Sequence, residues 1–319
     1  MTPRPSRAAL ALAALALAGC GANDASEATP ALSAGEPLGE GGELAWAVAD
    51  RVTSLDPLAA TTRAEELLTR QIHEPLIAGL AGPFGDTRRV PGLARRARAS
   101  GDSTIWTLRL RTGVRFQDGT PFNARAVLAN AERWQATTAG REQLPDLVDV
   151  FAPRFDVVRF ILAAPDRAFD ARLGMPQLGI VSPRALPPLG DGLRRALETG
   201  TGPFELRERS SDRQLLARNT SWWGTVGDVD LGPALDQVEF RAEPSAAVRL
   251  ALLDAGDVQL ADELARPQAD EALSDPLLSV LRGAPGTWLG LSRSVRGVDS
   301  ARDIPSLSRA WLTTVTVAD

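Results

Sequence analysis

The chain has 319 residues, of which 44% are hydrophobic and 24% charged, and its net charge is −5. This composition is that of a globular protein of one to three domains, and the acidic balance argues against nucleic acid as a partner. All 35 basic residues are arginine, which excludes a P-loop lysine and Schiff-base catalysis. One histidine and one cysteine exclude an HExxH zinc site, a CxxC pair and an intrachain disulfide.

The N-terminus has the pattern of a secretory leader. Two arginines precede an apolar run over 8–18, which is shorter than the roughly 20 residues that cross a membrane. The run ends in Leu17-Ala18-Gly19-Cys20, which resembles the lipobox of bacterial lipoproteins, whose cysteine receives a diacylglyceryl group. We expect a lipoprotein signal peptide over 1–19, lipidation at Cys20, and anchoring to the cell membrane on its periplasmic or extracellular side. The alternative is a plain signal peptide with an incidental cysteine.

Residues 20–41 are rich in Gly, Ala, Ser, Glu and Pro. Such a segment cannot bury a hydrophobic core, so we predict a flexible tether there.

The first half of the mature chain alternates between strand and helix patterns. The predicted elements are a strand over 43–48, a helix over 62–73, strands over 104–110 and 114–116, and a helix over 124–134. Asn123 has the residue type and position of an N-cap for the last of these helices.

The second half continues with short strands and one clear helix. The predicted elements are a strand over 157–162, a hairpin of 204–206 with 214–218, a strand over 236–241, a helix over 244–254, and strands over 258–261 and 288–291. Gly256 has the residue type that ends a helix. Strands and helices follow no regular βαβ rhythm, so we predict a mixed α/β (α+β) fold.

Four motifs occur in a particular order. They are Leu55-Asp56-Pro57 with His73-Glu74-Pro75-Leu76, the segment from Trp106 to Phe122 (WTLRLRTGVRFQDGTPF), Gly200-Thr201-Gly202-Pro203-Phe204 with Arg218-Asn219 and Trp222-Trp223, and Leu235 to Phe240 (LDQVEF) leading to Ala255-Gly256-Asp257-Val258. Together they resemble solute-binding protein family 5, which serves ABC importers of peptides, nickel and related solutes. The resemblance covers about residues 42–262.

The resemblance implies a periplasmic binding protein-like fold of type II with a ligand cleft between two lobes. We expect the first-lobe region over 42–262 and a truncated start of the second lobe over 263–319. It further implies a monomer without cofactor or metal that delivers a peptide or small molecule to an ABC permease. The matching positions for ligand contact are Thr61, Thr62, Arg63 and Trp134, with Arg63 suited to a carboxylate.

No catalytic constellation is visible, so we do not expect an enzyme. Gly200 and Gly202 indicate a turn, and His73 a packing or capping residue. Two alternatives to importer function remain open. One is a lobe-deficient scaffold or interaction lipoprotein that no longer binds a transported solute, and the other is a truncated gene product.

Overall fold

The computed structural model describes residues 41–81, 87–186, 197–226, 229–230, 233, 235–274, 278–280 and 290–293, all within one compact unit, Leu38–Asp319. The predicted leader and Cys20 lie outside these residues, as does the predicted tether except for residue 41. Within the described ranges, no helix is both long and apolar enough to span a bilayer.

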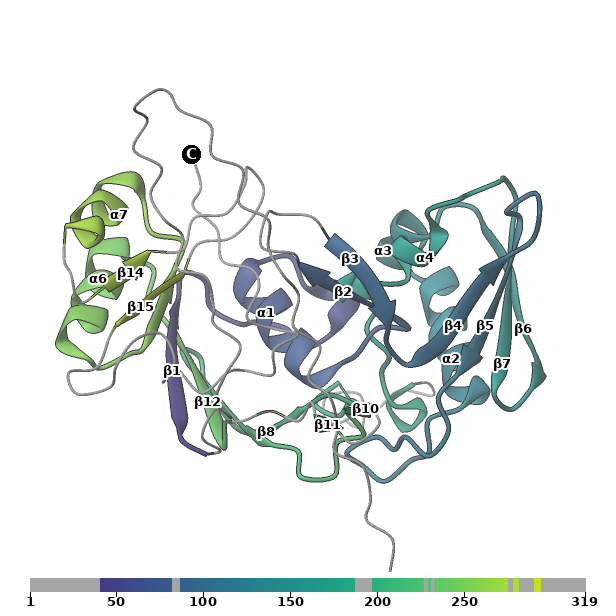
Figure 1. The fold of residues 1–319 in the computed structure, drawn as a ribbon, viewed down its shortest axis with the longest axis horizontal. Helices are drawn as coiled ribbons and strands as arrows, with labels where there is room; N and C mark the ends of the chain where they lie inside the picture. Colours follow the sequence, from purple (N-terminus) through teal and green to yellow (C-terminus); the bar gives the residue numbers. More distant parts are fainter. Residues whose placement is uncertain are drawn as a thin grey trace, which may run out of the picture. The chain divides into compact units, whose positions relative to one another are not determined.

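Seven strands form the larger sheet, in the order β14-β15-β13-β1-β12-β9-β8 (Figure 1). Their bounds are β1 (Glu43–Val48), β8 (Phe204–Arg209), β9 (Arg213–Arg218), β12 (Gln237–Ala242), β13 (Leu260–Asp262), β14 (Leu278–Val280) and β15 (Gly290–Arg293). The central strand β1 runs parallel to β12 and β13, whereas the other pairs are antiparallel. The carboxyl ends of β1, β12 and β13 therefore share one edge of the sheet, where parallel sheets commonly bind ligands.

The alternation of side chains along β1 builds a core on each face of this sheet. Leu44, Trp46 and Val48 pack with the buried face of helix α1 (Arg63–Ile72), and Trp46 stacks on Phe240 with ring centroids 5.6 Å apart. Ala47 points to the other face and packs with helices α6 (Ala246–Ala255) and α7 (Arg266–Leu273).

The second sheet has four antiparallel strands in the order β4-β5-β7-β6. They are β4 (Ala94–Ala99), β5 (Ile105–Leu110), β6 (Leu147–Arg154) and β7 (Val157–Leu162). Helix α2 (Ala124–Ala136), whose N-cap is Asn123, packs on one face of this sheet through Val127, Ala131 and Trp134. The side chains on the other face are exposed or half-buried.

Short elements complete the described structure. They are the paired strands β2 (Ile77–Ala81) and β3 (Thr87–Pro91), the paired strands β10 (Thr225–Val226) and β11 (Val229–Asp230), helices α3 (Thr138–Gln143) and α4 (Phe169–Arg172), and 3-10 turns at Pro57–Ala59, Pro176–Leu178 and Pro183–Ala185.

The structure confirms the mixed α/β class and most of the predicted elements. The helix predicted over 62–73 is α1 with its two caps, and Gly256 ends α6 in a left-handed conformation, with φ of +82°. The strand predicted over 288–291 overlaps β15, although Trp288 lies outside the described residues. Because β15 pairs with β13, the larger sheet continues across the predicted boundary after residue 262.

Candidate functional site

The motif residues meet around the C-terminal end of α1. Glu74 is buried, and its carboxylate accepts hydrogen bonds from the indole N–H groups of Trp222 (3.2 Å) and Trp223 (2.6 Å). The guanidinium of Arg111 lies 4.4 Å from the centroid of the Trp223 ring. Burial raises the pKa of the Glu74 carboxyl to about 7, and the indole donors act in the opposite direction.

The Gly200-Thr201-Gly202 turn packs against the last turn of α1. A Cβ on Gly200 would lie 1.9 Å from the carbonyl oxygen of Ile72, so no larger residue fits there. Gln117 ties the turn in place, because its backbone N–H donates to the Gly200 carbonyl (2.9 Å) and its amide to the Phe204 carbonyl (2.7 Å). These residues form a structural unit in which Glu74 and the two glycines are buried and the others are half-buried. We call it the motif junction: Glu74, Arg111, Gln117, Gly200, Gly202, Trp222 and Trp223.

His73 belongs to the same region and is buried. It is the C-cap of α1, and its Nε2 lies 2.9 Å from the carbonyl oxygen of Leu197. Burial lowers the pKa of its imidazole to about 4. The structure confirms the predicted packing and capping role.

A second group of charged residues lies where β1 and β13 end. Arg63 is the first residue of α1, Asp262 the last residue of β13, and Glu263 follows it. Both Arg63 and Asp262 are buried, and Arg249 on α6 is buried beside them. We call Arg63, Arg249, Asp262 and Glu263 the edge cluster.

Arg63 and Asp262 are held in a poorly solvated environment. Burial lowers the pKa of Arg63 to about 9 and raises that of Asp262 to about 7, and the attraction between the two charges works against both shifts. Neither carboxylate oxygen of Asp262 accepts a hydrogen bond from another residue in the part of the chain that the structure describes. A positive charge at the first residue of a helix also opposes the helix dipole. Helix stability therefore does not explain Arg63, whereas the attraction of the neighbouring Asp262 carboxylate does.

Arg249 fixes the backbone that carries Asp262. Its guanidinium donates to the carbonyl oxygens of Asp262 (3.0 Å), Glu243 (2.5 Å) and Glu263 (2.7 Å). Glu263 has a φ of +50°, a conformation that residues other than glycine rarely adopt. The two hydrogen bonds to Asp262 and Glu263 hold this unusual turn and keep Asp262 beside Arg63, and the third joins it to Glu243.

The loop before α1 places two of the predicted contact residues at the same edge. Thr62 is the N-cap of α1, and its hydroxyl accepts the Glu65 N–H (3.3 Å) in a capping box. Thr61 is exposed, Thr62 is half-buried, and Arg63 is 7% exposed. The structure therefore brings Thr61, Thr62 and Arg63 together at the start of α1.

Trp134 does not join them. Its side chain is 1% exposed and lies in the core between α2 and the four-stranded sheet. This position favours packing, and ligand contact by Thr61, Thr62, Arg63 and Trp134 stays a prediction.

Sequence reasoning missed the acidic half of the edge cluster. Asp262 directly follows the buried pair Leu260-Ala261, which is a local hint of an acid at a strand end. Only the parallel pairing of β13 with β1 brings it near Arg63, however, and that pairing has no local signal.

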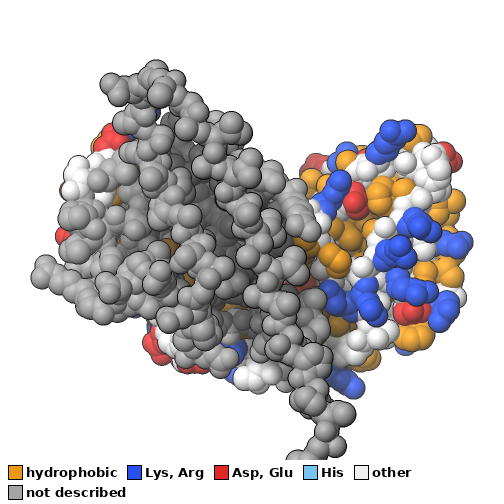
Figure 2. All heavy atoms as spheres, in the orientation of Figure 1, with side chains coloured by type: hydrophobic (Ala, Val, Ile, Leu, Met, Phe, Trp, Pro, Cys, Tyr) orange, Lys and Arg blue, Asp and Glu red, His pale blue; other side chains and the backbone are white. Residues whose placement is uncertain are grey.

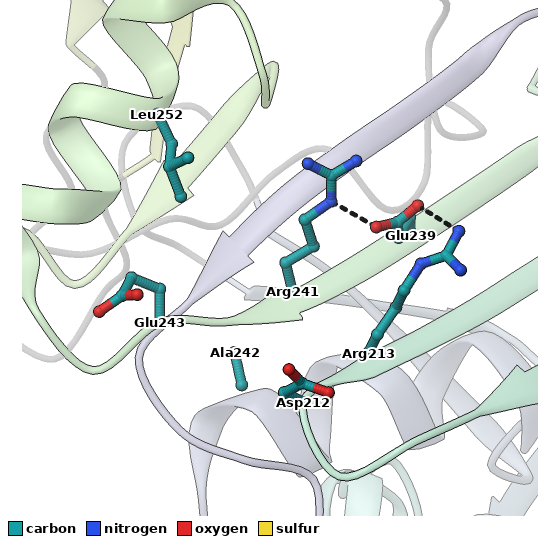
Figure 3. A pocket seen from close by; sticks show the side chains of 7 residues that line it. All are labelled: Asp212, Arg213, Glu239, Arg241, Ala242, Glu243 and Leu252. Carbon is teal, nitrogen blue, oxygen red and sulfur yellow. Dashed lines mark hydrogen bonds and ion pairs between the residues drawn. The ribbon is translucent and has the colours of Figure 1, made fainter.

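An open pocket of about 400 Å³ lies beside the edge cluster on the face of the larger sheet that carries α6 (Figure 3). Glu239 stands between Arg213 and Arg241 and bonds to both, with 2.9 Å from Arg213 Nη2 to Glu239 Oε2. Glu243 lines the pocket, and its backbone carbonyl binds Arg249. Because the charges of the two arginines are already paired with one carboxylate, this pocket is a weaker candidate than the edge cluster.

Within the described ranges, no group of three or more His, Cys, Asp or Glu is placed to hold a metal ion.

Comparisons with known proteins agree with the motifs. The glutathione-binding protein GsiB of Escherichia coli K12 is 30% identical over 226 residues, which are 70% of this chain and 42% of that protein. GsiB of Shigella dysenteriae is similar to the same extent. The chain thus spans about two fifths of the length of the curated relatives that it matches.

Solved structures of periplasmic binding proteins share the fold. DppA of Helicobacter pylori in complex with the peptide STSA has a TM-score of 0.66 at 25% identity, covering 76% of this chain and 50% of that one. NikA of Brucella suis in complex with Fe(III)-EDTA has a TM-score of 0.64 at 22% identity, covering 75% and 48%, which bears on the fold alone. These likenesses confirm the predicted periplasmic binding protein-like fold.

The family comparison covers more than half of the chain. The model described as "Bacterial extracellular solute-binding proteins, family 5 Middle" matches residues 88–296, a range that includes the motifs from Trp106 to Val258. The chain therefore belongs to the bacterial extracellular solute-binding proteins of family 5.

Proposed function

We propose that the chain is the substrate-binding component of an ABC importer and takes up a peptide or related small solute outside the cytoplasm, without catalysing a reaction. Membership of family 5 carries this proposal. The glutathione-binding relatives and the peptide complex of DppA support a peptide-like ligand. Family members deliver their solute to a permease complex, which is the partner we propose here.

The ligand is proposed to bind at the carboxyl ends of β1 and β13. Arg63 offers a planar set of donors that suits a carboxylate, and the attraction of nearby Asp262 leaves it charged at neutral pH. Thr61 adds an exposed hydroxyl at the same edge, and Thr62 holds the start of α1. Trp134 lies in the core of the four-stranded sheet, so its ligand contact is not part of this proposal.

The proposed location of the protein at the membrane rests on the leader and lipobox pattern of the N-terminus. We propose that Cys20 carries a diacylglyceryl group, whose two chains suffice for stable anchoring, and that residues 20–41 tether a monomeric binding domain to the membrane. Incorporation of labelled fatty acid into the chain, and its loss in C20S, would test the anchor.

Isothermal titration calorimetry of the full chain against short peptides, with glutathione included, tests the binding function. We expect heat with at least one peptide. Replacing Arg63 by Gln should then lower the affinity about 10- to 100-fold, the equivalent of 1.5–3 kcal/mol for a hydrogen bond to a charged group.

Two further variants keep this test informative if R63Q folds poorly. Asp262→Asn removes the opposing charge and should raise the affinity for ligands with a carboxylate, whereas Arg51→Gln, an exposed arginine of the same loop, should leave it unchanged. No heat with any peptide would count against solute binding and favour the scaffold or interaction lipoprotein.

A further inference from the structure

The uncovered face of the four-stranded sheet combines arginines with apolar side chains. Figure 2 shows both kinds gathered over strands β4 to β7. In register, Arg98, Thr107, Arg159 and Phe151 form one row across all four strands. Arg96 lies directly opposite Arg109 in the neighbouring row. We call Arg96, Arg98, Ile105, Arg109, Phe151 and Arg159 the arginine face.

Four arginines of this face form no ion pair with an acidic residue in the described part of the chain. Arg154 at the end of β6 pairs with Asp156 (3.3 Å), but within the described part of the chain no ion pair engages Arg96, Arg98, Arg109 or Arg159. Like charges directly opposite one another destabilise a sheet, so the Arg96–Arg109 pair carries a cost in the isolated protein. An anionic surface laid on the face would remove that cost.

Apolar side chains are concentrated in the same place. Five large hydrophobic side chains are exposed in the described ranges, and four of them lie on this sheet or in its β6–β7 turn: Ile105, Val148, Phe151 and Phe155. Phe155 is 67% exposed, and the guanidinium of Arg159 lies 5.9 Å from the Phe151 ring centroid. Arginine beside exposed aromatic and aliphatic groups is the composition of surfaces that lie in the headgroup region of a bilayer.

The positive charge is confined to the part of the chain that forms this sheet, whereas the chain as a whole is acidic. Residues 87–181 contain 15 arginines and nine acidic residues, which gives +6, whereas the whole chain carries −5. The remaining residues therefore carry −11. This asymmetry would orient the protein on a negatively charged surface, with the arginine face toward it.

We propose that the arginine face docks on anionic phospholipid, so that the domain lies on the membrane. The arginines would bind lipid phosphates, and Phe151, Phe155 and Ile105 would enter the headgroup layer. A broad sheet face with arginines on three strands fits a planar array of phosphates better than a single acidic segment of a protein. The inference rests on the proposed function only for the location beside a membrane.

Vesicle co-sedimentation of the full chain carrying C20S, which removes the lipid, tests this docking. The vesicles contain phosphatidylcholine alone or equal parts of phosphatidylcholine and phosphatidylglycerol. We expect tighter binding to the anionic vesicles and loss of that preference at high salt. Each arginine near an anionic membrane changes partitioning about fivefold, so the triple variant R96Q/R98Q/R109Q should lose about 100-fold.

The matched control is R51Q/R207Q/R266Q, which changes the net charge equally at exposed arginines of the larger sheet and of the loops and helices attached to it. It should retain binding, as should the charge-retaining variant R96K/R98K/R109K in large part. Equal losses in both glutamine variants, or no preference of the full chain for anionic vesicles, would overturn the proposal. Peptide calorimetry on the same triple variant separates this result from the proposed function, since solute binding should be unchanged.

Discussion

Glu65 organises the loop that carries the predicted ligand contacts. One carboxylate oxygen accepts hydrogen bonds from the Thr53 and Ser54 N–H groups (both 3.0 Å) and the Thr53 hydroxyl (2.6 Å). The other accepts the Thr61 N–H at 3.0 Å. Burial alone would raise the pKa of Glu65, but these donors outweigh it and lower the pKa. A single side chain thereby satisfies donors that the loop cannot pair otherwise.

Replacing Glu65 by Ala should lower the free energy of unfolding by about 3 kcal/mol, because several backbone donors lose a charged acceptor. Chemical denaturation with urea measures this. The neighbouring Glu66 accepts one hydrogen bond from Gln177 (2.7 Å), so E66A should cost about 1 kcal/mol or less. Equal costs for the two variants would show that Glu65 does not hold the loop.

Among the helices and strands, some features could be predicted from the sequence and others could not. The caps of α2 and α6 were predicted because Asn123 and Gly256 act through bonds to their own neighbours. Strand β4 had no predicted counterpart, because its sequence alternates alanine with arginine and carries no apolar stripe. It is a strand because its alanines face the core and β5 supplies its partners.

In the candidate site, too, some residues could be predicted from the sequence and others could not. Thr61, Thr62 and Arg63 are adjacent in the chain, so the resemblance placed them together. Asp262 joins them only through the sheet order β13-β1, a long-range pairing that no local pattern encodes. Strand β6 also had no counterpart, because its exposed side chains obscure the alternation expected of a half-buried strand.

The motif junction gives a prediction at this scale. Gly200→Ala should destabilise the protein by more than about 3 kcal/mol, because its Cβ would lie 1.9 Å from a backbone carbonyl of α1 that cannot move alone. Thermal unfolding measures the loss.

Gly101, in the turn between β4 and β5, is the matched control. A Cβ there meets nothing within 4 Å, so G101A should shift the free energy of unfolding by at most about 0.5 kcal/mol. A mild effect of G200A would mean that the turn and α1 can separate without loss.

For the whole molecule, the pH dependence of stability includes opposing contributions from the buried groups Glu74, Asp262 and His73. Glu74 and Asp262 each have a pKa of about 7 in the folded chain, above the ordinary carboxyl value, so their contribution is present at low pH and lost as the pH rises. His73, with a folded pKa of about 4, acts oppositely, because the unfolded chain takes up its proton first. The opposing contributions partly cancel in the unfolding free energy measured against pH, so variants are needed to separate the groups.

Glu74→Gln separates one of them, because glutamine has nearly the shape of the protonated acid and does not titrate. The unfolding free energy of the wild-type chain minus that of E74Q should fall by about 1 kcal/mol per pH unit between about pH 5 and pH 6.5. Urea denaturation across this range measures it. The same difference for His73→Gln should rise with pH, which provides a control of opposite sign. A flat difference for Glu74 would mean that the two indole donors stabilise its charged form enough to cancel the effect of burial.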